Sequence, residues 1–148
     1  MSRLVRALRR RCEGERGSAS IEAAVGVPAF LLIMGLVFAG GRVAIAGQSV
    51  EAAATEAARS ASIARTTGEA QGDALAAARR SLDEKGLQCA PRVDVDTSDF
   101  GSAVGVTSSV AATVTCDVAV GDLAVPGLPG TIRITKTMES PIDTYRER

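Results

Sequence analysis

Gly17-Ser-Ala-Ser-Ile-Glu22 lies directly before the one apolar run in the chain that is long enough to cross a bilayer. From Ala23 to Gly41 no residue carries a charge. At a helical rise of about 1.5 Å per residue this run measures about 28 Å, close to the hydrocarbon thickness of a membrane. The sequence therefore predicts a membrane-spanning helix over about residues 22–41, preceded by small residues and a lone glutamate.

Charge is distributed unevenly around this apolar run. The whole chain of 148 residues has no formal net charge, with 17 basic and 17 acidic residues. The leader, residues 1–17, is nevertheless basic, because it holds Arg3, Arg6, Arg9, Arg10, Arg11 and Arg16 against Glu13 and Glu15. Basic residues collect on the cytoplasmic side of a first membrane helix, so we expect the N-terminus inside the cell and the C-terminal part outside it. The arginines lack aromatic partners, and topology explains them better than nucleic-acid binding does.

The cysteines agree with this topology. Cys12 lies in the leader, on the reducing side, whereas Cys89 and Cys116 lie in the part expected to be exported, where a disulfide persists. Each of these two shares the parity of the alternating apolar residues near it, so both thiols point into one core unless Pro91 shifts the register. We therefore predict a Cys89–Cys116 disulfide, with two unpaired buried thiols as the alternative.

One long helix is predicted over residues 18–66, and its pattern is clearest from Ile21 to Ala64. The first half is apolar on all sides, and Pro28 is expected to kink or loosen it, because proline removes a backbone donor and clashes with the preceding turn. After Arg42 apolar residues recur every three or four positions, which indicates an amphipathic helix. These residues are Val43, Ala46, Val50, Ala54, Ala57, Ala61 and Ala64.

Residues 67–140 are predicted to form a small exported domain. After a break at residues 66–68, the stretch Gly72–Lys85 has helical periodicity and is followed by Gly86, a residue typical of helix ends. Around residues 92–96, 104–120 and 131–135 apolar residues instead recur at every second position, which is the period of strands. Because 104–120 is too long for one typical strand, we expect a turn near residues 107–109 or a bent strand.

The predicted fold class is therefore α+β. A long N-terminal helix, transmembrane and then amphipathic, precedes a short helix and an antiparallel sheet of three to four strands. A loop rich in turn residues joins the last two strands, and residues 141–148 form a polar tail. The turn residues of the loop are Pro126, Gly127, Pro129 and Gly130.

The composition argues against an enzyme. The chain contains no histidine, which excludes histidine-dependent triads and histidine-ligated metal sites. Asp94, Asp96 and Asp99 lack the full ligand pattern of a calcium loop, and a solvated strand end explains them better. No glycine-rich stretch has the spacing of a phosphate-binding loop. We expect no catalytic residues, no metal, no cofactor and no small-molecule substrate.

The residues from Arg16 to Glu22, followed by an apolar helix that contains Pro28, resemble the TadE-like pseudopilins of tight-adherence (Tad, or Flp) pilus systems. More broadly they are similar to the signal of type IV pilins, and the resemblance covers roughly residues 15–50. In those proteins a membrane-embedded prepilin peptidase cuts after a glycine on the cytoplasmic side, and the apolar segment stays with the mature protein. The resemblance implies a cut between Gly17 and Ser18.

The same resemblance implies an assembly role for Glu22, which would become mature position five. In type IV pilins this glutamate is thought to neutralise the N-terminal amine of a neighbouring subunit. The alternative is a headgroup-level glutamate favoured by the helix dipole. Major Flp-type pilins lack an exported domain, so the size here implies a minor pilin or pseudopilin. Its implied partners are the membrane, the prepilin peptidase, other pilin subunits and the Tad assembly platform.

Two other interpretations stay open. Ala44-Ile-Ala46, followed by Gly47, has the form of a signal-peptidase site, and cleavage there would release a small secreted protein. An uncleaved chain would instead be a single-pass anchor for an extracytoplasmic interaction domain. The sequence also leaves open whether the pilus would serve adhesion, DNA uptake or secretion.

Overall fold

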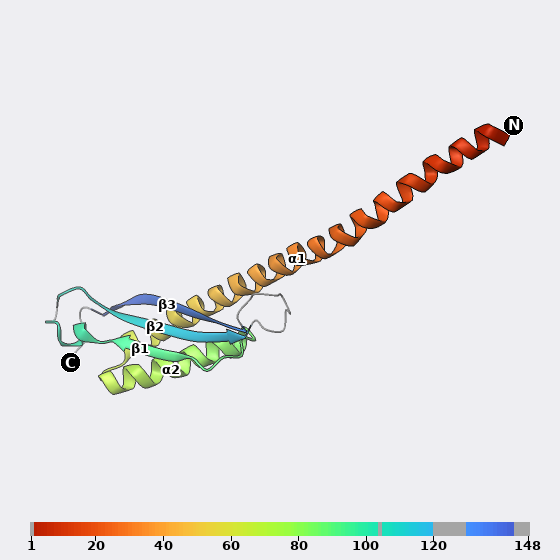
Figure 1. The fold of residues 1–148 in the computed structure, drawn as a ribbon. Coiled ribbons are helices and arrows are strands. Elements are labelled where there is room, and N and C mark those ends of the chain that lie inside the picture. The colour runs from red at the N-terminus through yellow and green to blue at the C-terminus, as the bar shows by residue number, and fades with distance from the viewer. Residues whose placement is uncertain (1, 104, 120–129, 144–148) are drawn as a thin grey trace. The chain divides into compact units, whose positions relative to one another are not determined.

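The computed structural model describes the backbone of residues 2–103, 105–119 and 130–143, and the side chains of this set from Ser20 onward. The chain divides into two compact units, residues 1–39 and residues 40–148. Helix α1 (Ser2–Ile63) runs through both of them (Figure 1).

The first unit is the N-terminal part of α1. The helix begins at Ser2, so the predicted leader is helical too, and it continues through Pro28. Arginine, leucine and glutamate, which make up most of the leader, are good helix formers, and this explains the longer helix. Within the described residues, the part of α1 from Ser20 is long and apolar enough to cross a membrane, with a mean hydropathy of 2.2 in its most apolar window.

Helix α2 (Thr67–Glu84) is longer than the sequence analysis predicted, because it begins five residues before Gly72. The N-terminal residues are held by a capping box. The backbone N–H of Glu69 donates to the Thr66 hydroxyl at 3.2 Å, and the Glu69 carboxylate accepts from the backbone N–H of Thr66 at 3.2 Å. Such a reciprocal pair satisfies N–H groups that a helix start leaves free. The predicted break at 66–68 therefore lies at residues 64–66.

Three strands form one antiparallel sheet in the order β1-β2-β3. They are β1 (Arg92–Asp96), β2 (Ser108–Ala119) and β3 (Thr131–Ile142), with the short helix η1 (Ser98–Gly101) after β1. The described residues between 104 and 120 thus contain one strand, and the turn lies at Gly105, whose φ of 92° suits glycine, and not at residues 107–109. Strand β3 extends seven residues past the predicted end at 135, into the first two residues of the predicted tail. Pro126, Gly127 and Pro129 lie outside the described residues, as do residues 144–148.

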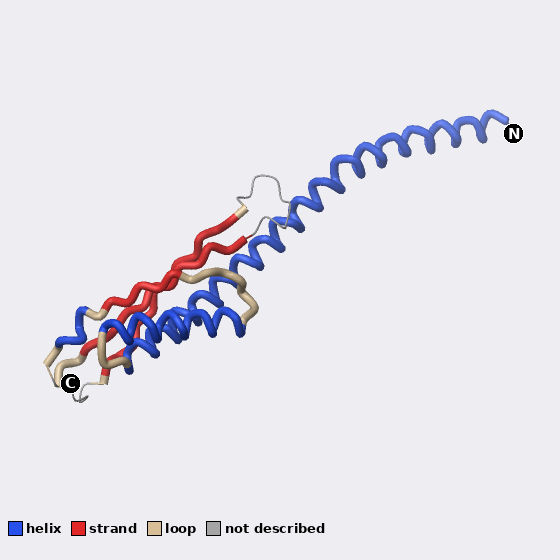
Figure 2. The backbone as a smooth tube through the Cα atoms, turned by 90° about the horizontal axis from the view of Figure 1, so that it is seen from below, coloured by secondary structure: helices blue, strands red, loops and turns tan. Residues whose placement is uncertain are grey.

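The core of the second unit lies between one face of the sheet and the two helices (Figures 1 and 2). Residues of β2 alternate between buried and half-buried, with Val110, Ala112, Val114 and Cys116 fully buried. Most of the buried helix residues are alanines. In the core cluster they are Ala53, Ala54, Ala57, Ala58, Ala61, Ala70, Ala74 and Ala78, and buried Ala64 directly follows α1. A core of such small side chains allows close approach of the elements but buries little apolar area per residue.

This close approach predicts a matched pair of effects on α2. We expect Ala74→Leu to lower the free energy of unfolding by about 1–3 kcal/mol, because Ala74 is fully buried and a larger side chain must displace its neighbours. Ala76→Leu should have little effect, because Ala76 is exposed on the same helix. Urea midpoints of the two variants measure the difference. Equal midpoints would show that the alanine face is not closely packed.

Candidate functional site

The sequence-predicted processing residues lie on α1. Gly17 and Ser18 belong to its helical backbone, while the Ser18 side chain lies outside the described set. Glu22 follows Ser18 by four residues, or about one helical turn, and its side chain is exposed. None of the side chains described by the structure forms an ion pair with Glu22. A carboxylate at the edge of an apolar segment is costly unless it meets a partner or the headgroup region.

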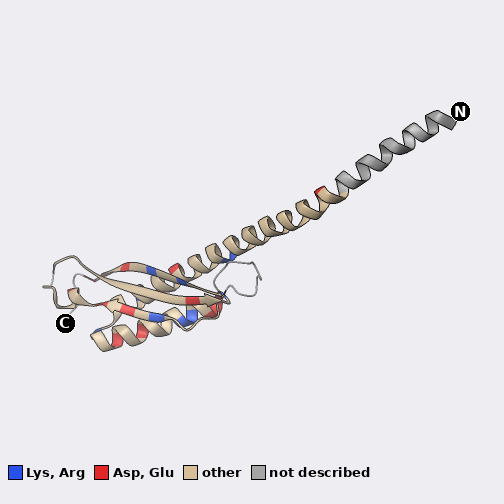
Figure 3. Ribbon diagram, in the orientation of Figure 1, with Lys and Arg blue, Asp and Glu red and all other residues tan. Residues whose placement is uncertain are grey.

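The helix surface after Glu22 is apolar and uncovered. Only 6% of the most apolar 18-residue stretch of this helix is buried, and Figure 3 shows this part of α1 without charged residues. The exposed large apolar residues here are Val25, Val27, Phe30, Leu31, Leu32, Ile33, Met34, Leu36, Val37 and Phe38. A contiguous apolar surface of this extent is typical of contact with a membrane or with other protein. The first unit thus has the properties of a membrane helix that is able to pack against other helices.

Pro28 lies in the middle of this surface. Without an N–H group it leaves the carbonyl of Ala24, four residues earlier, without its usual helical donor. The helix nevertheless continues on both sides of Pro28. The predicted kink or loosening remains a prediction about how the helix adapts to its surroundings.

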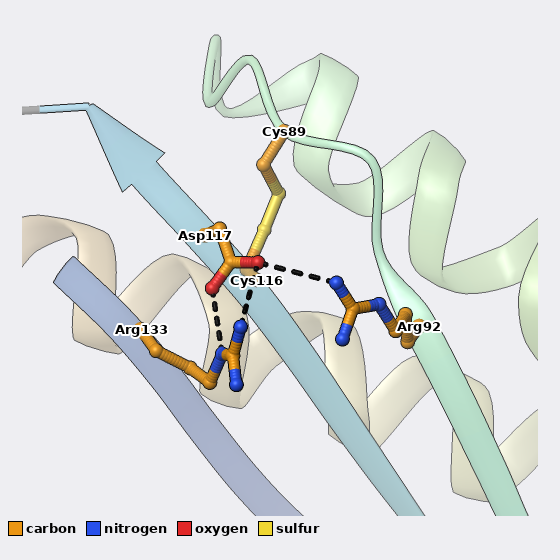
Figure 4. The surroundings of a disulfide bond; sticks show 5 residues. All are labelled: Cys89, Arg92, Cys116, Asp117 and Arg133. Atoms are coloured by element: carbon orange, nitrogen blue, oxygen red, sulfur yellow. Dashed lines mark hydrogen bonds and ion pairs between the residues drawn. A yellow bond between two sulfur atoms is a disulfide. The ribbon is translucent and has the colours of Figure 1, made fainter. Parts of the chain in front are cut away.

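The second site that the sequence analysis named joins β2 to the segment before β1. Cys89 and Cys116 are linked by a disulfide bond, with their Cα atoms 5.9 Å apart (Figure 4). Cys116 is fully buried in the core, while Cys89 is half-buried at its margin. The bond closes a loop over a sequence separation of 27 residues. It connects the end of the helical region to the central strand.

Beside the disulfide, an ion cluster that the sequence analysis missed spans all three strands (Figure 4). The Asp117 carboxylate accepts hydrogen bonds from Arg133 Nε at 2.7 Å and Nη2 at 3.3 Å, and from Arg92 Nη2 at 3.4 Å. The hydrogen bond from Arg133 lowers the pKa of Asp117, and the same contact raises the pKa of Arg133. The three side chains are substantially exposed, so the cluster aligns the strands more than it stabilises them.

Comparison with known families decides the class of the N-terminal helix. Residues 17–59 match the family model described as TadE-like protein. The chain carries a TadE-like segment. The match begins at Gly17 and lies wholly within α1. This agrees with the family predicted from the sequence, and TadE-like proteins are pilus components that are not known as enzymes.

The TadE-like segment and the candidate membrane span together indicate a Tad pilus-associated, single-pass membrane protein. Helix α2 and the sheet lie outside the matched residues. No curated protein and no solved structure matches the chain significantly. Across the described residues, no group of three or more acidic or cysteine side chains is arranged to hold a metal ion.

Proposed function

We propose that this chain is a minor pilin or pseudopilin of a Tad pilus, processed by a prepilin peptidase and then assembled through α1. The observation that carries the proposal is the TadE-like match, which starts at Gly17 and is followed by an uncovered apolar helix. The N-terminus would stay in the cytoplasm, and the second unit would be exported. The exported unit would then be the part that other components of the pilus meet.

The first step is hydrolysis of the peptide bond between Gly17 and Ser18. It removes the basic leader and creates an amine at Ser18, about one helical turn from Glu22. The apolar part of α1 remains in the mature chain, because it begins after the cut. The mature helix then has a cation and an anion at the same end.

The second step is movement of α1 from lipid to a filament. Apolar side chains that leave water gain about 1.5–3 kcal/mol each, but side chains that leave lipid for other helices gain little from the same effect. Apolar packing alone is therefore a weak guide to register. A charge pair between Glu22 and the Ser18 amine of a neighbouring subunit supplies that register, because an unpaired charge there is costly.

The direct test is the mature N-terminus, measured by mass spectrometry of protein from the membranes and medium of the native host. A start at Ser18 supports the proposal. A start at Gly47, with the protein in the medium, identifies a secreted protein released by signal peptidase and rules the proposal out. An intact N-terminus rules out processing and leaves a single-pass anchor.

The assembly role predicts a specific defect for Glu22→Ala. We expect processing to remain largely intact and incorporation into sheared pili to fall at least about ten-fold, since losing one partner of a desolvated pair costs about 3 kcal/mol or more. Immunoblots of pilus and membrane fractions measure both quantities. Asp73→Ala is the control, because it removes an exposed carboxylate from α2. Normal incorporation of Glu22→Ala would refute the assembly role.

A further inference from the structure

An open groove of about 520 Å³ lies in the second unit where α1, the end of α2 and the end of β2 meet. Its lining is amphipathic, with two cations, polar groups and apolar side chains. The lining residues are Arg42, Ile45, Ala46, Ser49, Lys85, Gly86, Leu87, Gln88, Val118 and Ala119. No acidic residue belongs to this described lining.

One of the two lining cations, Arg42, belongs to α1. It directly follows Gly41, the last residue of the uncharged run, within the same helix. If residues 23–41 span the hydrocarbon, Arg42 lies at the level of the lipid headgroups, where long basic side chains reach phosphate groups. Ile45 is exposed beside it, one helical turn further along α1.

Lys85 reaches the same groove from a part of the chain far away in sequence. The end of α2 is closed by backbone hydrogen bonds from Gly86 to Asp83 at 3.0 Å and from Leu87 to Leu82 at 3.0 Å. Gly86 adopts a φ of 68°, which glycine tolerates best and which turns the chain at this point. The turn packs Leu87 against the core and leaves Lys85 on the surface, in the lining of the groove.

The two cations are not neutralised within the described part of the chain. Its three ion pairs use Arg92, Arg133 and Lys136, and neither Arg42 nor Lys85 takes part in them. An occupant that complements the groove therefore carries negative charge for the cations and apolar surface for Ile45, Leu87 and Val118. A diacyl phospholipid with an anionic headgroup has both properties on one molecule.

We propose that this groove binds the headgroup of an anionic phospholipid in the leaflet next to the second unit, with Arg42 and Lys85 on the phosphate. The proposal rests on the membrane insertion of α1 that the proposed function includes. Binding would hold the second unit against the membrane before assembly. Withdrawal of α1 into a filament would then require release of the lipid.

The test uses the full, uncleaved chain in a non-ionic detergent, titrated with phosphatidylglycerol or phosphatidylcholine and examined by native mass spectrometry. We expect phosphatidylglycerol adducts to exceed phosphatidylcholine adducts, and Arg42→Gln with Lys85→Gln to weaken phosphatidylglycerol binding about ten-fold. Arg79→Gln with Arg80→Gln removes the same charge from exposed positions of α2 outside the groove, and should leave binding unchanged. Circular dichroism checks that each variant is folded. Lys85→Arg keeps the positive charge at this position, so unlike Lys85→Gln it should retain phosphatidylglycerol binding.

Three results would overturn the proposal: equal binding of both lipids, unchanged binding in the Arg42/Lys85 variant, or an equal loss in the Arg79/Arg80 control. Unchanged lipid binding together with lost pilus incorporation would assign the groove to an acidic protein surface instead. Because the readout needs neither cleavage nor a pilus, its failure is distinct from failure of the proposed function. The mature N-terminus tests that function separately.

Discussion

Gly17→Val is expected to leave the protein at full length, with the mature form that starts at Ser18 reduced at least about ten-fold. The residue before the scissile bond must fit closely into the peptidase site, and glycine alone has no side chain to obstruct it. The family match begins at this residue, and the proposed cut lies directly after it. Intact mass spectrometry of the membrane fraction measures the ratio of the two forms.

Gly14→Val is the matched control for this change. It makes the same substitution three residues earlier, in the same basic leader and the same helix. A general effect of valine on export or helix formation would therefore appear in both variants. Normal processing of Gly17→Val, or an equal defect in Gly14→Val, would contradict the proposed cleavage site. Gly17→Ala should show a defect in the same direction.

Loss of the disulfide is expected to have the largest effect on the stability of the second unit. For a loop over 27 residues, the chain-entropy relation gives a loss of about 3–4 kcal/mol in the free energy of unfolding. Cys89→Ala is the informative variant, because Cys89 is half-buried and its replacement removes little packing, whereas Cys116 is fully buried. Pulse proteolysis of the full chain across a urea series measures the change.

Two comparisons isolate the bond in that experiment. A reductant should shift the wild-type urea midpoint toward that of Cys89→Ala and should not shift the variant. Cys12→Ser should behave as wild type, because Cys12 lies in the leader and outside the bonded pair. A wild-type midpoint that does not respond to reductant would mean that the second unit is stable without the bond.

A dependence of this size follows from the composition of the core. Among the described residues, sixteen buried apolar side chains form this core, and most of those on the helices are alanine. Such a core buries little area per residue, and folded domains are stable by only about 5–15 kcal/mol in total. A covalent link between Cys89 and the central strand therefore represents a large share of the stability.

Local patterns were sufficient to predict most elements, but the start of α2 and the end of β3 were predicted wrongly. The start of α2 was placed at Gly72, although Thr66 and Glu69 have the spacing of a capping box and indicate the earlier start. The alternation of Ile132 and Ile134 predicts a strand only to residue 135, whereas β3 continues to Ile142. In the structure Lys136 pairs with Glu51 of α1 at 3.1 Å, and the Ser140 hydroxyl lies 3.2 Å from that of Ser62.

The sequence alone was enough to recognise the membrane-length apolar run and the spacing of Gly17 and Glu22. It was also enough to recognise the helical period and the strand period. Each depends on residues close together in the chain, so no tertiary contact is needed to recognise it. The strand register, the Asp117 ion cluster and the groove of Arg42 and Lys85 were decided only by the tertiary structure. Their residues lie far apart in the chain, and they meet only because the packing of helices on the sheet brings distant segments together.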